Sequence, residues 1–176
     1  LAEVDELVRP PLMDLRAREQ QLRSQALDAL VTRTLIEREA ARGNPRAIPF
    51  PRAVCSDGSL DFSFSGLKTA VVHHLKGYGP TGRAGEAPGD AEVRDICASF
   101  QEAAVDMLVE RLMRAAQEVG VGRLVVAGGV ACNGALRRAL KAEAEAEGFE
   151  LYLPAPSLCT DNAAMIAAAG HWRYLA

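Results

Sequence analysis

The sequence predicts an α/β fold in which helices alternate with short strands. Apolar residues recur at helical spacing along residues 95–119, and a β-branched run at 124–127 follows soon after. A second strand-like run, "FELYLPAP", stands between two further segments that favour helix. Because a helix separates the two strand-like runs, the chain crosses over between them, and we expect the strands to pair in parallel.

Composition and charge narrow the class of protein. The 176 residues are 49% hydrophobic, which is sufficient for one domain with a sizeable core. Aromatic residues are few and alanines are many, a composition that favours closely packed helices. The formal net charge of −3 does not favour a chain that coats nucleic acid. DNA binding is therefore not expected, and any contact with RNA would need a local basic patch.

The same sequence gives no sign of a membrane or secreted protein. It has no apolar run near the ~20 residues that span a bilayer. Acidic residues stand near the start, where a signal peptide would have a basic head. Four cysteines are scattered without a C-x-x-C pair, as is typical of reduced thiols in the cytoplasm.

The first half of the chain has weaker patterns. Residues 1–42 are rich in Arg, Glu, Gln and Leu, and parts of them favour a solvated helix. In residues 43–52, the prolines favour an extended backbone. Alternation in "DFSFS" predicts a short strand, and Ser65 is a candidate N-cap for a helix over residues 66–75. Glycines and prolines in residues 77–90 predict a flexible loop that divides the chain.

The second half is patterned more clearly. One apolar stripe is predicted along the helix at 95–119; its members are Ile96, Phe100, Ala104, Met107, Leu108, Leu112, Ala115 and Val119. The run at 124–127 is expected to be a buried strand, and residues 133–147 a helix that ends at Gly148. Thr160 or Asp161 is expected to cap a last helix, whose small residues 163–170 predict close packing against its neighbours.

A candidate ligand site follows the first strand in "AGGVACNGALRR". Gly128 and Gly129 have no Cβ atoms, so a phosphate or ribose could approach the backbone at the carboxyl end of the strand. Asn133 could hold a sugar hydroxyl or cap the helix that it opens. A tight turn that binds nothing explains the same residues. The spacing matches neither a dinucleotide fingerprint nor a P-loop.

Asp161, in "CTDNAAM", is a second candidate. Its carboxylate could cap the last helix, where the helix dipole favours negative charge, or could bind a metal. Further ligands are not close in the sequence. His73 and His74 are adjacent, so on a helix their side chains diverge by roughly 100°. His171 is expected to be a surface residue.

Four long motifs occur in order: "DFSFSGLKTAV", "ASFQEAAVDMLVERLMRAA", "LVVAGGVACNGALRRAL" and "LPAPSLCTDNAAMIAAAG". Together they resemble the C-terminal lobe of the TsaD family, formerly called glycoproteases. The resemblance runs from about residue 35 to residue 174. It implies one lobe of the actin-like, sugar-kinase-like ATPase fold, which is ribonuclease H-like. It also implies transfer of threonylcarbamoyl from its adenylate to adenosine 37 of tRNA.

The resemblance also implies roles for individual residues. Asn133, with Gly128 and Gly129, matches the segment that contacts the adenylate or an ATP-type nucleotide. Asp161 matches a ligand of the family's single divalent metal, iron or zinc, while Ser65 and Lys68 border the cleft as weaker candidates. The implied partners are tRNA and TsaB-like and TsaE-like proteins.

The chain departs from the family pattern in two respects. It has no H-x-x-x-H motif for the other metal ligands, and it lacks the N-terminal lobe with its "VSGGHT" loop. No catalytic residue is therefore assigned, and the chain is expected to be inactive by itself. The alternative is a non-catalytic, TsaB-like dimerisation or scaffold module that uses the helix at 95–119.

Residues 1–34 form a separate segment in this interpretation, and residues 35–176 form the lobe. The family carries "LGYPGG" just before the helix that matches "LIEREAARGNP", whereas this chain has "DALVTRT". Codons for residues 28–33 can be chosen so that a shifted frame reads Cys-Leu-Gly-Tyr-Pro-Gly. The first segment is therefore expected to be an out-of-frame translation, which the underlying nucleotide sequence can test.

Overall fold

The computed structural model of the chain describes residues 34–52, 59–61, 63–78, 87–160 and 162–175. Residues 34–40 are helical, and residues 43–52 have no regular structure. The later elements are α2 (Phe64–Leu75), α3 (Asp90–Val119), β1 (Arg123–Val125), the 3₁₀ turn η1 (Gly129–Cys132), α4 (Gly134–Glu147), β2 (Glu150–Tyr152), α5 (Pro156–Cys159) and α6 (Ala163–Leu175). The predicted loop at 77–90 lies largely outside the described residues.

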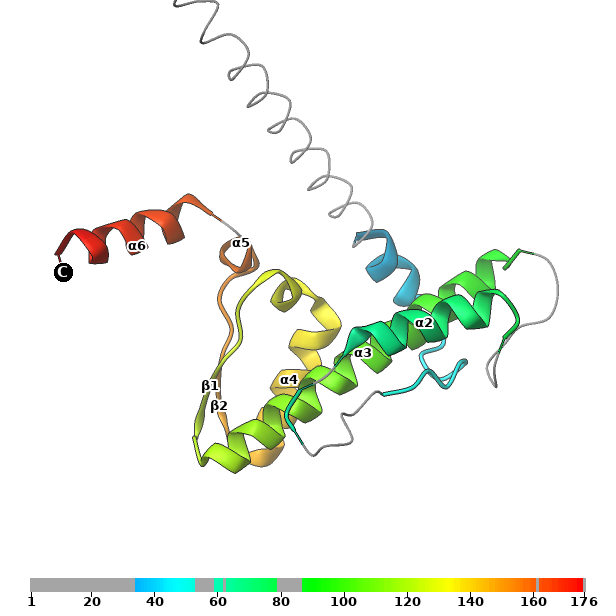
Figure 1. Ribbon diagram of the computed structural model, residues 1–176, viewed down its shortest axis with the longest axis horizontal. Helices are drawn as coiled ribbons and strands as arrows, with labels where there is room; N and C mark the ends of the chain where they lie inside the picture. The colour runs from blue at the N-terminus through cyan, green and yellow to red at the C-terminus, as the bar shows by residue number, and fades with distance from the viewer. Residues whose placement is uncertain (1–33, 53–58, 62, 79–86, 161, 176) are drawn as a thin grey trace, which may run out of the picture.

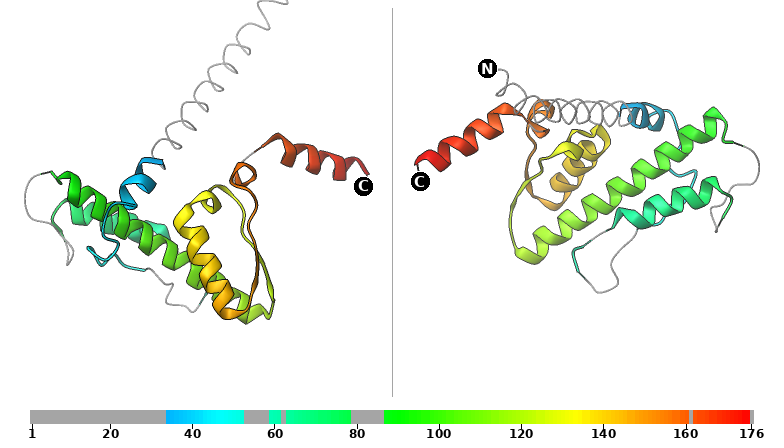
Figure 2. Two further views of the ribbon diagram at one scale, coloured as in Figure 1. Left: turned by 180° about the vertical axis from the view of Figure 1, so that it is seen from behind. Right: turned by 45° about the horizontal axis from the view of Figure 1, so that its top comes forward.

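Helix α3 is the central element of the molecule. Figures 1 and 2 show α2 lying along one part of it and α4 packing near its other end. Ile96, Ala103 and Met107 of α3 pack with Ile48, Phe50 and Leu67, while Val105, Met113 and Ala116 pack with Leu124 and three residues of α4. Six of the eight predicted stripe residues thus pack in the core, but α3 buries two faces instead of one, and Val119 is exposed.

The two strands pair in parallel, which confirms the prediction from the crossover. Arg123 lies opposite Glu150, Leu124 opposite Leu151 and Val125 opposite Tyr152. Leu124 is buried against α3 and α4, but the side chain of Val125 is 72% exposed. The expectation of a buried strand thus holds for one face of β1 only, because nothing among the described residues covers the other.

Local hydrogen bonds set the starts and ends of the helices. Gly148 ends α4 with φ +76°, as the sequence predicted, and Asn133 caps it, which is one of the two roles that the sequence allowed. The predicted strand at 61–65 is wrong, because Phe64 begins α2 and the Ser63 side chain, rather than that of Ser65, caps it. The cap of α6 is Asn162 instead of Thr160: its Oδ1 accepts the Met165 N–H at 3.1 Å.

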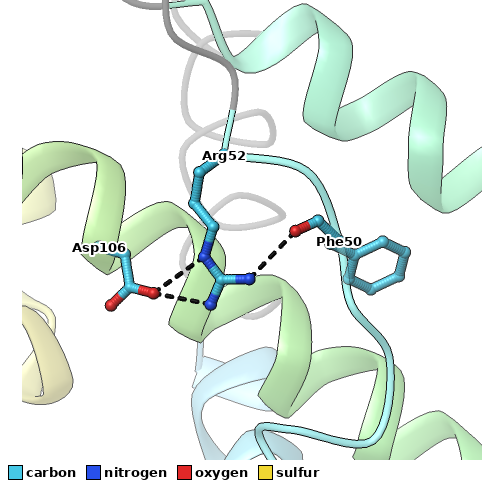
Figure 3. A network of polar contacts seen from close by, with 3 residues as sticks. All are labelled: Phe50, Arg52 and Asp106. Carbon is cyan, nitrogen blue, oxygen red and sulfur yellow. Dashed lines mark hydrogen bonds and ion pairs between the residues drawn. The ribbon is translucent and has the colours of Figure 1, made fainter.

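Residues 43–52 fasten the first helix to α3. The Asn44 N–H donates to Asp95 Oδ1 at 2.7 Å, and the Ser99 hydroxyl accepts the Ile48 N–H at 3.1 Å. Arg52 then bonds Asp106 through Nε at 3.0 Å and Nη2 at 2.7 Å (Figure 3). This segment therefore closes the apolar cluster around Phe50.

Helix α6 does not pack as the sequence predicted. None of its residues is buried, and the helix extends away from the rest of the described chain in both figures. Its exposed apolar side chains include Trp172 at 71% and Tyr174 at 88%. No helix within the described ranges has both the length and the apolar character that crossing a bilayer requires.

Candidate functional site at the strand ends

The carboxyl ends of β1 and β2 lead into two turns that lie side by side. The first contains Gly128–Gly129 and η1, and the second contains α5. Arg137 of α4 joins them: its Nη1 donates to Ala131 O and its Nη2 to Pro154 O, both at 2.9 Å. The Cys132 thiol also donates to Pro156 O at 3.2 Å. Arg137 was not predicted from the sequence, because its position five residues after a strand-end turn gives no specific signal.

Gly128 and Gly129 form an open corner at the end of the first turn. Gly128 has φ +92° and ψ 170°, a conformation that residues with a side chain rarely adopt. No atom of the described residues lies within 4 Å of a Cβ built at either glycine, so each Cβ position faces open space within the described part of the chain. We call Gly128, Gly129 and Asn133 the glycine corner.

Asn133 connects the glycine corner to two helices that are distant in the sequence. Its Oδ1 accepts the Leu136 N–H at 2.9 Å, which caps α4. Its Nδ2 donates to Glu37 Oε1 at 3.2 Å and to Gln101 Oε1 at 3.1 Å. The cap, one of the two roles left open by the sequence, is therefore present, and both amide protons have partners on the helix at 34–40 and on α3.

Comparison with known proteins matches this region to one family. The model of tRNA N6-adenosine threonylcarbamoyltransferase, TsaD, matches residues 17–168. The chain belongs to the TsaD family. It is 54% identical over 135 residues to the tRNA N6-adenosine threonylcarbamoyltransferase of Geobacter metallireducens, 77% of this chain and 38% of that protein. The protein of the same name from Anaeromyxobacter sp. strain Fw109-5 is 52% identical over 142 residues, 80% of this chain and 40% of the relative.

The chain thus spans about two fifths of the length of the TsaD relatives that it matches. The family match begins at residue 17, before the four motifs on which the resemblance was based. It includes the glycine corner, Arg137 and both partners of Asn133. These contacts therefore belong to the TsaD part of the chain.

The remaining candidate site residues are Asp161, Ser65 and Lys68. Asp161 lies outside the described residues, and no three His, Cys, Asp or Glu side chains within the described ranges gather where they could hold a metal ion. Ser65 and Lys68 are exposed on α2 and form no hydrogen bond or ion pair with the glycine corner. Lys68 instead lines an apolar cavity of about 400 Å³ with Val71, Ile96 and Phe100.

Glu37 and Gln101 contact the glycine corner through Asn133 but were not predicted from the sequence. Glu37 is 96 positions from Asn133, and Gln101 is 32 positions away. Neither stands in a motif that could be assigned to a ligand from residue spacing. Only the packing of the helix at 34–40 and of α3 beside the turn brings them to the amide of Asn133.

Proposed function

We propose that this chain supplies the nucleotide side of a threonylcarbamoyl transfer site. The reaction is attack by the N6 amine of a tRNA adenosine on the carbonyl of threonylcarbamoyl-adenylate, with AMP as the leaving group. One observation carries the assignment: the glycine corner is open and lies where both parallel strands end, in a chain of the TsaD family. Ligands of α/β sheets bind at such strand ends.

The glycine corner suits an adenylate chemically. Gly128 and Gly129 allow the ligand to approach the backbone, and the N-terminal N–H groups of α4 favour the negative phosphate. Asn133 can keep its cap through Oδ1 while its Nδ2 exchanges Glu37 or Gln101 for a ligand oxygen.

A metal would need residues beyond those described. We propose Asp161 as one ligand of a divalent ion, iron or zinc, on the basis of the family resemblance. The described residues do not by themselves fit such an ion, and the three histidines of the chain have no H-x-x-x-H spacing.

The setting of this function is proposed from the family. The chain would form the C-terminal lobe of an actin-like ATPase fold and act in the cytoplasm on tRNA, with TsaB-like and TsaE-like partners. A scaffold role through α3 has less support, because that helix packs two of its faces within the chain. Few of its apolar side chains are left for a partner helix.

Nucleotide titration tests the glycine corner. ATP and AMP are titrated calorimetrically into the chain, its Asn133→Ser variant and its Asn162→Ser variant. Serine caps helices about as well as asparagine, so both variants keep a cap and lose an amide. We expect binding by the parent chain and by Asn162→Ser, and its loss in Asn133→Ser. Absence of binding by the parent, or equal binding by all three, would contradict the proposal.

The activity of the isolated chain is a separate question. With tRNA and freshly generated threonylcarbamoyl-adenylate, we expect no modified adenosine above the enzyme-free control. The reason is that the chain covers about 38% of a relative that bears the enzyme's name. Mass spectrometry of the digested tRNA detects the product, and product formed by this chain alone would refute the half-site assignment.

A further inference from the structure

Two cysteines lie where the turns that follow β1 and β2 come together. Cys132 is the last residue of η1 and Cys159 the last residue of α5, and these two short elements pack against each other. The Cys132 thiol donates to Pro156 O at 3.2 Å. The Cys159 thiol donates to Pro154 O, two residues earlier, at 3.7 Å. Thiols from two separate turns are therefore directed at one short stretch of the chain.

Arg137 connects the second thiol to the main chain of the first cysteine. Its Nη1 donates to Ala131 O at 2.9 Å and, at 3.9 Å, to the Cys159 sulfur. Ala131 O belongs to the peptide bond that joins Ala131 to Cys132. One guanidinium nitrogen therefore bridges the Cys159 sulfur and the peptide bond that carries Cys132.

The two thiols differ in their access to solvent. Both are free in the structure, but Cys132 is half-buried, whereas Cys159 is 4% exposed. Cys97, the third cysteine of the described part of the chain, lines the apolar cavity between the helix at 34–40, α2 and α3, and forms no hydrogen bond with either turn. An accessible thiol beside a second, resolving thiol is the arrangement typical of redox-sensing cysteines.

We propose that Cys132 and Cys159 are a peroxide-sensitive pair that closes to a disulfide. Hydrogen peroxide transfers one oxygen to the Cys132 sulfur, which gives a sulfenic acid and one water. The Cys159 thiol then attacks that sulfur, the S–O bond breaks, and a second water leaves as the S–S bond forms. Two electrons pass from the thiols to the peroxide, so the reaction needs no other oxidant. A dithiol reverses it by exchange.

The disulfide ties the turn after β1 to the turn after β2. Cys132 directly precedes Asn133, the cap of α4, so the bond also fixes the glycine corner relative to α5. This modification is separate from the proposed transfer reaction, because its reactants are the two thiols and a peroxide. Its tests contain no nucleotide or tRNA, and their outcome is therefore independent of that reaction.

Peptide mapping tests the pair directly. The reduced chain is treated with hydrogen peroxide, the remaining thiols are blocked with N-ethylmaleimide, and a tryptic digest is analysed by mass spectrometry without reductant. Trypsin separates the two cysteines because it cleaves at Lys141. We expect a linked peptide pair that contains Cys132 and Cys159 and that dithiothreitol separates. Oxidation of Cys132 without this link, or a link from either cysteine mainly to Cys97 or to a second chain, overturns the proposal.

Three alanine variants test the order of the two steps. Cys159→Ala removes the resolving thiol, so we expect the sulfenic acid at Cys132 to persist and to be trapped by dimedone. In Cys132→Ala, Cys159 should stay reduced at peroxide concentrations that oxidise it in the parent. Cys97→Ala is the matched control and should form the link as the parent does. Equal trapping at Cys132 in the parent and in Cys159→Ala would show that Cys159 does not resolve the sulfenic acid, and would contradict the pair.

Urea unfolding tests whether the folded chain already positions the two thiols for the bond. A disulfide that suits the folded geometry stabilises the chain by constraining the unfolded state. The urea midpoint of the parent should therefore rise on oxidation and return on reduction. Cys132→Ala keeps every methionine of the parent and should show no such rise, so it controls for other effects of peroxide. A lower midpoint in the oxidised parent would mean that the bond distorts the two turns, and would overturn the proposed pair.

Discussion

Gly128 and Gly129 are adjacent but differ in what they require of the backbone. Gly128 has φ +92° and ψ 170°, whereas Gly129 is not at positive φ, and both have open space where a Cβ would stand. We expect Gly128→Ala to lower the free energy of unfolding by about 1–3 kcal/mol through strain. Gly129→Ala should change it by less than ~0.5 kcal/mol. Urea denaturation measures both, and equal losses would show that φ is not the cause.

The Cys97 thiol should make the folding stability of the chain depend on pH. Burial, and next the charge of Glu39, raise the pKa of its thiol above the ordinary 9.0. The folded chain therefore holds this proton more tightly than the unfolded chain. The resulting stability is fully present below pH 9 and is lost as the pH rises through the folded pKa. We expect the parent to lose more stability than Cys97→Ala between pH 8 and a pH of about 10.5.

The comparison is made by urea unfolding at several pH values, with Cys97→Ser as a second variant. The rate of iodoacetamide labelling gives an independent check, because the thiolate is the reactive form. The rate of Cys97 labelling should still rise with pH above 9, where the rate for a thiol with the ordinary pKa levels off. Parallel stability curves for the parent and both variants would rule out a contribution from this thiol.

Residues with local roles could be identified from the sequence, but their distant partners could not. Asn133 and Gly148 delimit α4 as predicted, because a cap and a left-handed helix end are decided within a few residues. The bonds from Asn133 to Glu37 and Gln101 depend on how three elements pack. The same holds for Arg137, which bonds two turns that come together only in the fold.

At the scale of elements, the segment at 43–52 is held against α3 both by a buried aromatic side chain and by an ion pair. Phe50 is 1% exposed in the cluster under α2 and α3, whereas Arg52 pairs with Asp106 near the surface (Figure 3). We expect Phe50→Ala to cost about 3–5 kcal/mol of unfolding free energy because it leaves a cavity. Arg52→Ala should cost less than ~1 kcal/mol, since solvent screens the pair.

Thermal and urea unfolding of the two variants measure this difference. Phe50→Leu is a suitable intermediate, because it keeps most of the buried volume and should lose less than Phe50→Ala. Adding salt should reduce the effect of Arg52→Ala without changing that of Phe50→Ala. Similar losses for both alanine variants would mean that the ion pair, not the aromatic ring, fixes this segment.

Elements with a strong internal pattern were easier to predict than elements that depend on neighbours. The crossover order predicted the parallel pairing, which does not depend on the rest of the sheet. Alternation in "DFSFS" favoured a strand, but the Ser63 hydroxyl accepts the Ser65 N–H and starts a helix instead. Most residues of the predicted stripe on α3 are in the core, but they lie on two faces because different neighbours cover the two halves of the helix. One sequence does not reveal which neighbours those are.

At the scale of the whole molecule, the described chain has surfaces that its own residues do not cover. The sheet has two strands within the described ranges, and α6 buries none of its side chains. The sequence predicted close packing for α6 because small residues usually line helix contacts. Small residues indicate that a helix can pack closely, but they do not identify the element against which it packs. The chain spans about two fifths of its relatives, so an uncovered helix is consistent with its length.

The exposure of α6 leads to a prediction for the whole molecule. A chain that ends after Asn162 removes α6, whose apolar side chains, including Ile166 and Trp172, are exposed. Because the core loses no contact, its urea midpoint should stay the same and its free energy of unfolding should change by less than ~0.5 kcal/mol. A chain that ends after Gly148 also removes Phe149, Leu151 and Leu153, which pack against the core, and should unfold readily. If the shorter deletion alone destabilises the core, α6 must pack in solution against residues that it does not contact here.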